Sequence, residues 1–411
     1  MNKTMRQDGR AILDCAIKAV LPDEAVRRAL EGRSFPGHVV LIAAGKAAWQ
    51  MANAAWGCLG GAVSGGVVIT KYGHAKGKIG NLICCEAGHP VPDENSFSGT
   101  EQAIAAVQGL TERDTVLFLL SGGGSALFEK PMISGEELQG ITSQLLACGA
   151  DIVEINTIRK RLSAVKGGRF AQLCAPAQVF SVVLSDVLGD RLDMIASGPV
   201  SPDRSTCEQA RNIAEKYHLR LSIRAQELLN RETPKELHHV HSVVTGSVRE
   251  LCAAAARACQ ERGYAPMILT DRLRCQAREA GSFLASIAVS HAEDGRRQAF
   301  LAGGETVVRL TGSGKGGRSQ ELALAAAEDI AGLRNVLILS AGSDGTDGPT
   351  DAAGGIVDGD TAEELAAHGI SIHRALENND AYHALKKTDG LIVTGPTGTN
   401  VNDVAILLIE P

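Results

Sequence analysis

Short apolar runs alternate with helix-like amphipathic segments along nearly the whole chain. Apolar runs typical of buried strands lie within HVVLIAAG, DTVLFLLSGGG, VFSVVLSDV, HSVVTG, APMILTD, NVLILSAGSDG and GLIVTG. Most of these runs end near glycine and lead into a segment with helical periodicity, which is typical of βαβ units. The pattern therefore predicts an α/β protein with a mostly parallel, helix-covered sheet.

The length of the chain predicts two domains. Its 411 residues, 44% of them hydrophobic, exceed what one ordinary core uses, and they can bury two. The polar segment RETPKELH, residues 231–238, interrupts the pattern and contains Pro234, so we expect domains over residues 1–235 and 236–411. An N-terminal helix is expected over about residues 4–20, ended by Pro22, and it could pack on either domain.

Charge and hydropathy narrow the classes of function. The formal net charge of −6 and an isoelectric point near 6.0 leave no overall basic surface for nucleic acid or anionic lipid. No apolar run reaches the roughly 18 residues of a membrane span, and the N-terminal residues lack the layout of a signal peptide. We therefore expect a cytoplasmic protein that binds neither nucleic acid nor membranes.

Cysteine and histidine spacing gives little support to a metal site. The ten cysteines are scattered, and no C-x-x-C pair occurs, so most are expected to be small buried apolar residues. His238, His239 and His241 lie close in sequence, but a strand there would place only His239 and His241 on one face. A metal-binding histidine cluster is therefore the less favoured interpretation.

Two glycine-containing turns follow apolar strands, where open α/β sheets bind their ligands. Lys46 follows the strand VVLIAA, and a lysine near a helix N-terminus favours anions, although an ordinary surface lysine is the alternative. The turn SGGGS, residues 121–125, follows VLFLL, and its three glycines allow the backbone to wrap a ligand. A merely flexible turn is the competing interpretation.

A third stretch concentrates positive charge. INTIRKRLSAVKGGRF, residues 155–170, contains Arg159, Lys160, Arg161, Lys166 and Arg169. Most such charges are only solvated, but five cations in an acidic protein favour an anionic ligand, and we expect one or two of them to bind it. Helical spacing would place Arg159 and Lys166 on one face, two turns apart.

A fourth turn is acidic. Asp186 and Asp190 lie four residues apart after the strand VFSVVL, and paired carboxylates near phosphate oxygens suit Mg²⁺. Asp193 instead could pair with Arg191 or cap a helix.

The stretch LTGSGKGGRSQELALAAAEDI, from Leu310, admits two interpretations. Gly312, Gly314 and Gly317 satisfy G-x-G-x-x-G, the pattern of a dinucleotide-binding turn. Lys315 and Arg318 in the same turn favour instead a phosphotransferase that grips a nucleotide's phosphates.

An acidic, glycine-rich stretch, SAGSDGTDGPTDAAGG from Ser340, also follows an apolar strand. It contains Asp344, Asp347 and Asp351, and its spacing does not fit an EF-hand loop. It could be only a solvated turn, or it could hold substrate hydroxyls, a ribose or a metal ion.

These motifs together resemble one known family. GGETVVRLTGSGKGGRSQELALAAA, SAGSDGTDGPTDAAGG and TGPTGTNVNDVAILLI resemble the C-terminal MOFRL domain of the class II glycerate kinases. AAGKAAW, LLSGGGSALFEKP, INTIRKRLSAVKGGRF and SDVLGDRLDMIASGP resemble the N-terminal domain of that family, and the likeness runs from about residue 6 to the end. The resemblance implies a Rossmann-like α/β/α domain, a C-terminal α/β domain with the MOFRL region at about residues 298–408, and an active site in the interdomain cleft.

The resemblance also implies an activity and its residues. Family members phosphorylate D-glycerate at the 2-hydroxyl with ATP and Mg²⁺, and some carry the name hydroxypyruvate reductase. Lys46 and Arg318 correspond to a pair regarded as essential for phosphoryl transfer. The other implied contacts are Ser121, Gly122, Gly123, Gly124, Ser125, Arg159 and Lys166 for substrate or phosphate, Gly314, Lys315, Gly316, Gly317, Asp344 and Asp347 for nucleotide, and Asp186 and Asp190 for metal.

The chemistry of phosphoryl transfer is consistent with these residue types. Its loose transition state spreads negative charge over oxygens, so catalysis needs mainly positioning and cations. Lys46 and Arg318, from different domains, could meet when a cleft closes and excludes water. Arg159 suits the glycerate carboxylate, and Asp186 could orient the 2-hydroxyl or accept its proton. A homodimer is left open by the sequence.

Two other functions stay open at this stage. An NAD(P)H-dependent hydroxypyruvate reductase would use the G-x-G-x-x-G pattern, with Asp344 as the ribose-binding acid, but Asp344 lies farther along than the roughly 20 residues expected. That function also gives Lys315 and Arg318 no clear role. A non-catalytic nucleotide-binding regulator would need neither Lys46 nor Arg318.

Overall fold

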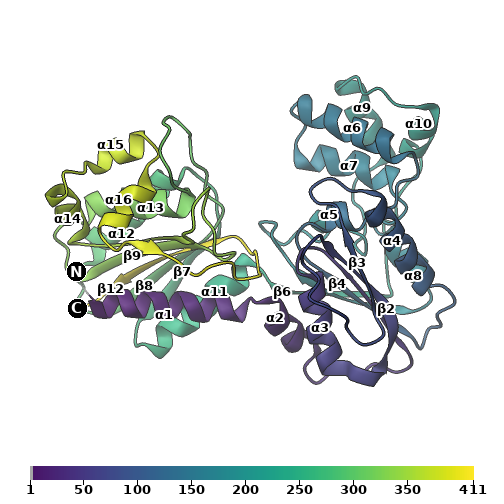
Figure 1. The fold of residues 1–411 in the computed structure, drawn as a ribbon, viewed down its shortest axis with the longest axis horizontal. Helices are drawn as coiled ribbons and strands as arrows, with labels where there is room; N and C mark the ends of the chain where they lie inside the picture. The colour runs from purple at the N-terminus through teal and green to yellow at the C-terminus, as the bar shows by residue number, and fades with distance from the viewer. Residues whose placement is uncertain (1–2) are drawn as a thin grey trace. The chain divides into compact units, whose positions relative to one another are not determined.

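The computed structural model describes residues 3–411 and divides the chain into two units (Figure 1). The N-terminal unit is Pro22–Thr245, and the C-terminal unit combines the segment up to Leu21 with Gly246–Pro411. The division therefore falls after the expected boundary at residue 235. Helix α1 (Lys3–Ala19) belongs to the C-terminal unit, although it comes first in the chain.

The N-terminal unit is built on a six-stranded sheet with the order β3-β2-β1-β4-β5-β6. Its strands are β1 (Val39–Ala44), β2 (Val63–Lys71), β3 (Ile83–Ala87), β4 (Thr115–Leu120), β5 (Gln178–Leu184) and β6 (Val240–Gly246). The pairs from β3 through β5 are all parallel. Every residue of β1 and β4 is buried, because helices cover both faces of the sheet, and this explains their continuous apolar sequences.

Helices pack on both faces of this sheet and beyond it. They are α2 (Pro22–Leu30), α3 (Ala48–Leu59), α4 (Glu94–Ala106), α5 (Gly124–Leu127), α6 (Gly135–Ala147), α7 (Ile152–Leu162), α8 (Arg169–Cys174), α9 (Cys207–Lys216) and α10 (Ile223–Leu229), with 3₁₀ turns at Gly60–Ala62 and Ile195–Ser197. Alternate residues of β1 enter two cores, one shared with α2 and α3 and the other with α4 and α8. Helices α6, α7, α9 and α10 share a third core (Figure 1).

The C-terminal unit has a second six-stranded sheet with the order β11-β10-β9-β12-β8-β7. Its strands are β7 (Ala265–Leu273), β8 (Gln298–Gly304), β9 (Val336–Gly342), β10 (Gly354–Asp358), β11 (Leu391–Ile392) and β12 (Asp403–Ile409). Only β7 and β8 pair in parallel, and the other pairs are antiparallel. The expectation of mostly parallel strands does not hold here: β12, the last strand, inserts between β8 and β9 and runs against both, and β10 runs against β9 and β11.

The second sheet is also covered on both faces. The remaining helices are α11 (Val248–Glu261), α12 (Ala277–His291), α13 (Arg318–Asp329), α14 (Thr361–Ala367), α15 (Ile372–Glu377) and α16 (Ala381–Lys387). Helices α1 and α11 pack on one face, and α12, α13 and α16 pack on the other (Figure 1). A buried ion pair of 2.7 Å between Arg6 and Asp358 fixes α1 to this unit.

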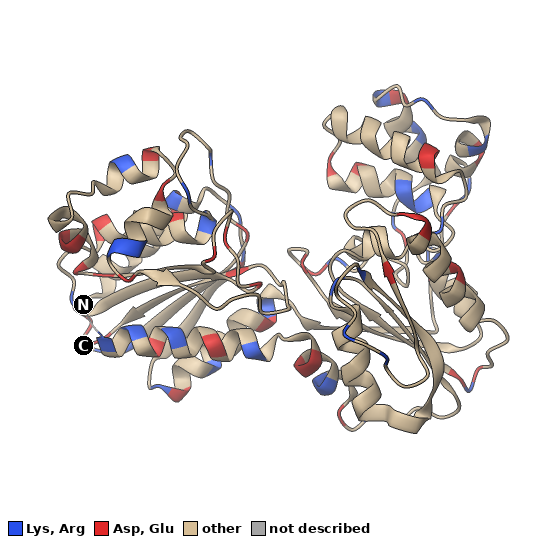
Figure 2. Ribbon diagram, in the orientation of Figure 1, with Lys and Arg blue, Asp and Glu red and all other residues tan. Residues whose placement is uncertain are grey.

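Charged residues lie mainly on the helices and loops, and the strands are nearly free of them in Figure 2. Both signs are interspersed in that view, in agreement with the small net charge. Among residues 3–411, no helix is long and apolar enough to span a membrane.

Candidate active site

The candidate active site of the N-terminal unit lies where its strand order reverses. From β1 the chain continues to β2 and β3 on one side of the sheet, and β4, β5 and β6 lie on the other. The carboxyl ends of β1 and β4 therefore form a topological switch point, which is where open parallel sheets bind ligands. Lys46 follows β1 and the Ser121–Ser125 turn follows β4, so the structure brings these two predicted elements together.

Hydrogen bonds join the two turns directly. The backbone N–H of Lys46 donates to the carbonyl oxygen of Gly122 over 2.9 Å, and the N–H of Ala47 donates to Oγ of Ser121 over 3.1 Å. Gly45 has a φ of +125°, and a Cβ there would lie 2.2 Å from Oγ of Ser121. Only glycine permits both this left-handed backbone and this close approach, so the sequence Gly45-Lys46 fixes how the lysine leaves the strand.

The Lys46 side chain is exposed, and its ammonium group forms no ion pair with any residue that the structure describes. It stands at the N-terminus of α3, whose N-cap residue, Ala47, provides no side-chain cap. The first N–H groups of a helix carry partial positive charge and favour anions when no side chain occupies them. The lysine and the helix terminus together therefore form an open cationic corner beside the SGGGS turn.

Two further side chains lie against the SGGGS turn. Gly123 has a φ of +85°, and a Cβ on it would lie 3.1 Å from Nε2 of His89 and 3.1 Å from Cγ of Lys46. A Cβ on Gly122 would lie 2.5 Å from Oδ2 of Asp186. The bare glycine backbone thus forms a floor that Lys46, His89 and Asp186 surround.

His89 was missed by the sequence reasoning. It is half-buried and follows β3, and its pKa is lowered by burial and by the charges of Lys46, Lys71 and His74. The sequence feature that could have identified His89 is its position just after a strand, next to Pro90. That strand, ICCEA, is too short and too polar to be recognised from the sequence.

The acidic turn after β5 offers oxygen ligands. The Asp186 carboxylate lies against the glycine turn. Asp190 has a positive φ of 52°. Its Oδ1 is buried and has no hydrogen-bond partner among the described residues. An orphaned buried carboxylate oxygen suits a cation, so these residues fit a Mg²⁺ ion that also binds phosphate oxygens. Residues 3–411 contain no cluster of three or more potential metal ligands from His, Cys, Asp and Glu.

Arg159 and Lys166 converge under the far end of the glycine turn. Arg159 donates from Nη2 to the carbonyl oxygen of Ser125 over 2.9 Å, and Lys166 donates from Nζ to the same oxygen over 2.8 Å. Both cations lie within 3.5 Å of Glu129, whose side chain is fully buried and was not anticipated. Burial lowers the pKa of Lys166 to about 8, with Glu129 opposing this effect. This geometry shows both cations supporting the turn.

The predicted shared helical face of Arg159 and Lys166 is wrong. Helix α7 ends at Leu162, and Lys166 reaches Ser125 from the loop that follows. The other three cations of the stretch bond within the unit: Lys160 pairs with Asp203 over 3.0 Å, Arg161 donates to Ser205, and Arg169 donates to backbone carbonyls. Direct contact of Arg159 or Lys166 with a substrate stays a prediction.

In the C-terminal unit, most of the predicted nucleotide contacts line one pocket of about 720 Å³. Its lining includes Gly314, Gly316, Gly317, Arg318, Asp344 and Asp347. Lys315 does not line it, because its ammonium lies 4.6 Å from the ring centre of Tyr382. The pocket size suits a small organic ligand.

Arg318, the first residue of α13, is held by two acids. Its Nε lies 2.6 Å from Oδ2 of Asp403, and its Nη1 lies 2.9 Å from Oε1 of Glu305. Burial alone would lower the pKa of Arg318, but these carboxylates raise it. Burial raises the pKa of Asp403 to about 6, although Arg318 opposes this shift. Asp403 and Glu305, which were not predicted, thus fix the guanidinium at the rim of the pocket.

Asp347 occupies the N-terminus of α13. Its carboxylate accepts hydrogen bonds from the N–H groups of Ser319 and Gln320 over 3.2 and 2.9 Å, and burial raises its pKa. A dinucleotide-binding turn would leave these amides for the pyrophosphate. A Cβ on Gly317 would lie 2.2 Å from Cγ of Asp347, so this glycine is required for packing of the carboxylate.

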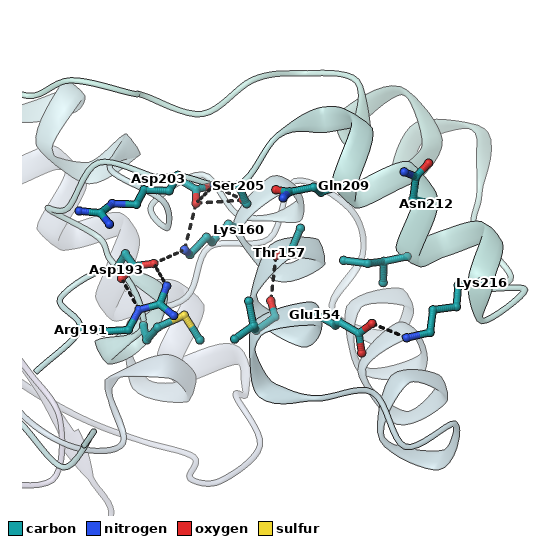
Figure 3. A pocket seen from close by; sticks show the side chains of 14 residues that line it. Glu154, Thr157, Lys160, Arg191, Asp193, Asp203, Ser205, Gln209, Asn212 and Lys216 are labelled. Atoms are coloured by element: carbon teal, nitrogen blue, oxygen red, sulfur yellow. Dashed lines mark hydrogen bonds and ion pairs between the residues drawn. The ribbon is translucent and has the colours of Figure 1, made fainter. Parts of the chain in front are cut away.

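A separate pocket of about 460 Å³ lies beside α7 and α9 in the N-terminal unit (Figure 3). Its charged side chains largely neutralise one another: Lys160 pairs with Asp203, Lys216 pairs with Glu154, and Arg191 pairs with Asp193 over 2.8 Å. The predicted pairing of Asp193 with Arg191 is confirmed. None of the site residues implied by the family resemblance lines this pocket, and Lys160, a candidate cation that does, is paired with Asp203. The switch point is therefore the stronger candidate for chemistry.

The three neighbouring histidines do not converge. His239 contacts the carbonyl oxygen of Ala171, His241 stacks on Phe180, and His238 lies near Glu236. Each of the three side chains therefore has a different partner.

The fold and its turns define a two-unit α/β protein with a candidate anion-binding site at the switch point of its parallel sheet. Residues 8–230 match a family described as a domain of unknown function (DUF4147), and residues 298–403 match the MOFRL family.

The chain is 52% identical to D-glycerate 2-kinase of Thermotoga maritima over 97% of each chain. A crystal structure of a glycerate kinase from the same organism superimposes with a TM-score of 0.96 at 51% identity, covering 99% of this chain and 100% of the other. A relative from Agrobacterium vitis, 39% identical over 98% of this chain and 94% of its own, is named a putative hydroxypyruvate reductase. The chain therefore belongs to the glycerate kinase family with a C-terminal MOFRL domain, and the expected resemblance is confirmed.

Proposed function

We propose that the protein is an ATP-dependent D-glycerate 2-kinase. The observation that carries this proposal is the open cationic corner at the switch point, where Lys46 and the uncapped start of α3 stand beside the SGGGS turn. The likeness to D-glycerate 2-kinase of Thermotoga maritima supports the choice of substrate and reaction.

Lys46 and Arg318 are the proposed catalytic cations. In the reaction, the 2-hydroxyl oxygen of glycerate forms a bond to the γ-phosphorus, and the bond from that phosphorus to the β,γ-bridging oxygen breaks. Negative charge spreads over the phosphoryl oxygens, so an exposed ammonium and a fixed guanidinium would lower the barrier. Each belongs to a different unit.

The remaining predicted residues receive roles consistent with their surroundings. We propose that the SGGGS turn binds phosphate or substrate oxygens through its backbone N–H groups, and that Asp186 orients the glycerate hydroxyl. Asp186 and Asp190 would hold Mg²⁺, which neutralises phosphate charge when bound. Arg159 and Lys166 keep the turn in place, and capture of the glycerate carboxylate by Arg159 is a further prediction.

Nucleotide binding is proposed for the C-terminal pocket. Gly314, Gly316 and Gly317 present close-packed backbone there, and Asp344 is half-buried at the same pocket. Occupation of the α13 terminus by Asp347 argues against the dinucleotide turn of a reductase. The two alternative functions, a hydroxypyruvate reductase and a non-catalytic nucleotide-binding regulator, are distinguished from the kinase by the experiment below.

The testing experiment compares two reactions of the purified protein. With D-glycerate, ATP and Mg²⁺, we expect ADP release that depends on glycerate, and ³¹P NMR of the product should show phosphate on the 2-hydroxyl. With hydroxypyruvate and NADH, we expect no oxidation of NADH. The reverse result would establish the reductase, and nucleotide binding without turnover would establish the regulator.

Metal dependence, assembly and cellular location need separate tests. We expect EDTA to abolish turnover and Mg²⁺ to restore it, and metal-independent turnover would contradict the proposed Asp186–Asp190 site. A homodimer would show twice the chain mass of 43.0 kDa in sedimentation equilibrium. Recovery in the cytoplasmic fraction of the source cells would support the expected location.

A further inference from the structure

His89 lies beside the SGGGS turn and Lys46, and neither the sequence motifs nor the family resemblance assigned it a role. It follows β3, two strands away from β1, yet its imidazole lies beside Gly123 in the turn after β4. The space that a Cβ on Gly123 would fill is 3.1 Å from Nε2 of His89 and 3.1 Å from Cγ of Lys46. The imidazole and the lysine therefore flank the same glycine.

The ring nitrogens of His89 are available for a ligand. Within residues 3–411, neither nitrogen has a hydrogen-bond or ion-pair partner, although the side chain is half-buried. By contrast, Nδ1 of neighbouring His74 lies 3.0 Å from the carbonyl oxygen of Lys46, and Nε2 of His239 lies 2.8 Å from that of Ala171. A partly buried polar group with no partner in the protein is a candidate for contact with a substrate.

The surroundings favour the neutral form of this imidazole. Burial lowers the pKa of His89 below its ordinary 6.5, and the nearby Lys46, Lys71 and His74 lower it further. Two acids lie on the neighbouring backbone, Asp93 beside Gly88 and Asp186 beside Gly122. A neutral imidazole can accept a proton, whereas an imidazolium cannot.

Resting on the proposed kinase function, we propose that His89 is the general base of the reaction. As the 2-hydroxyl oxygen of glycerate bonds to the γ-phosphorus and the bond to the bridging oxygen of ADP breaks, the hydroxyl proton passes to the free imidazole nitrogen. His89 then releases this proton to solvent after the products leave. In this proposal Asp186 orients the hydroxyl and binds the metal, and His89 rather than Asp186 accepts the proton.

The proposal dictates the sign of the pH dependence. The active form carries a neutral His89, so kcat/KM should fall as the pH drops through the lowered pKa of this histidine in the free enzyme. Bound anionic substrates oppose the effect of the nearby cations and raise that pKa. The acidic limb of kcat should therefore lie at higher pH than the acidic limb of kcat/KM.

The test uses the full-length variants His89→Gln and His89→Ala over about pH 5 to 8, with glycerate-dependent ADP release as the assay. Loss of a general base lowers kcat by about 100-fold or more. We expect His89→Gln to show that loss without the acidic limb assigned to His89, and added imidazole to restore part of the activity of His89→Ala. Thermal unfolding and the KM for ATP should stay near wild type, because Gln occupies a similar volume.

A matched control is His368→Gln, since His368 is an exposed histidine on the C-terminal unit. It should preserve kcat and both limbs. A His89→Gln variant that keeps the wild-type pH profile, whatever its kcat, would overturn the base assignment, because a structural role leaves the limb in place. Absence of glycerate-dependent ADP release from the wild type would instead refute the proposed function itself.

Discussion

Two glycine-rich turns of this molecule look alike in sequence and differ in physical use. SGGGS at residues 121–125 runs into α5, and GSGKGG at residues 312–317 leads into α13. The first turn lies beside Lys46, and the second contains Lys315. In the first, Gly123 takes a left-handed φ of +85°. In the second, none of the glycines has a positive φ, and a Cβ on Gly314 would lie 2.5 Å from the carbonyl oxygen of Asn378.

The helix termini beside the two turns differ in the same way. The N-terminus of α3 next to SGGGS has no side-chain cap, whereas Asp347 fills that of α13. Lys46 is exposed without an ion pair among the described residues, whereas Lys315 lies over Tyr382. A glycine pattern thus describes close backbone approach, and the surrounding charges decide whether the approaching group is a ligand or another part of the chain.

The largest expected effect is the loss of kcat when either proposed catalytic cation is removed. Lys46→Ala and Arg318→Ala should each lower kcat for glycerate phosphorylation by about 100-fold or more, because each removes charge that stabilises the transition state. Steady-state assays with glycerate and ATP give the measurement. Lys78→Ala, at an exposed lysine, is the matched control and should leave kcat unchanged.

Lys315→Ala sharpens the same comparison. Because its ammonium packs on an aromatic ring, we expect a change below about tenfold, mainly in the KM for ATP. A loss of kcat as large as that of Lys46→Ala would show that the two turns share one role.

The next effect concerns stability of the first turn. Gly45→Ala places a Cβ 2.2 Å from Oγ of Ser121 at a φ of +125°, and such strain costs about 2 kcal/mol. The unfolding transition of the N-terminal unit should move to lower temperature in calorimetry. Gly65→Ala is the control, since no atom lies within 4 Å of its Cβ position and its φ is not positive. Equal transitions for both variants would refute the required close approach.

Much of the fold could be predicted from the sequence, because strands that are buried on both faces have continuous apolar sequences. The strands VVLIAA and TVLFLL were recognisable for this reason, as was α1 with its boundary before Pro22. The antiparallel pairing in the second sheet could not be predicted in this way. It depends in part on β12, the last strand of the chain, which pairs with β8 and β9.

The candidate site shows the same limit. Lys46, SGGGS and Asp186 each follow a long apolar strand, so their common edge of the sheet was predictable. His89 follows a short strand at the edge of the sheet, and Glu129 and Asp403 act through partners far away in sequence. Local patterns carry no information about such pairings, which appear only when the chain is folded.

A smaller effect tests the occupied terminus of α13. Asp347→Ala removes two hydrogen bonds to the first amides of the helix, and loss of such a cap costs about 1 kcal/mol. Chemical denaturation monitored on the C-terminal unit should show the loss. Asp344→Ala, whose carboxylate accepts only from Thr346 among the hydrogen bonds seen, is the matched comparison and should cost less. A larger loss for Asp344→Ala would contradict the capping role.

The last prediction concerns the pH dependence of stability in the C-terminal unit. Burial raises the pKa of folded Asp403 to about 6, above the ordinary value of 3.8, so the folded state binds this proton more tightly than the unfolded state. The resulting stabilisation is present below about pH 4 and is lost as the pH rises through 6. Asp403→Asn lacks this titration, so the melting temperature of wild type relative to this variant should decline between pH 4 and 6. A rise in this relative melting temperature between pH 4 and 6 would mean that the ion pair with Arg318 outweighs burial. Folded Asp403 would then have a lowered pKa, and a charged carboxylate would hold the guanidinium of Arg318.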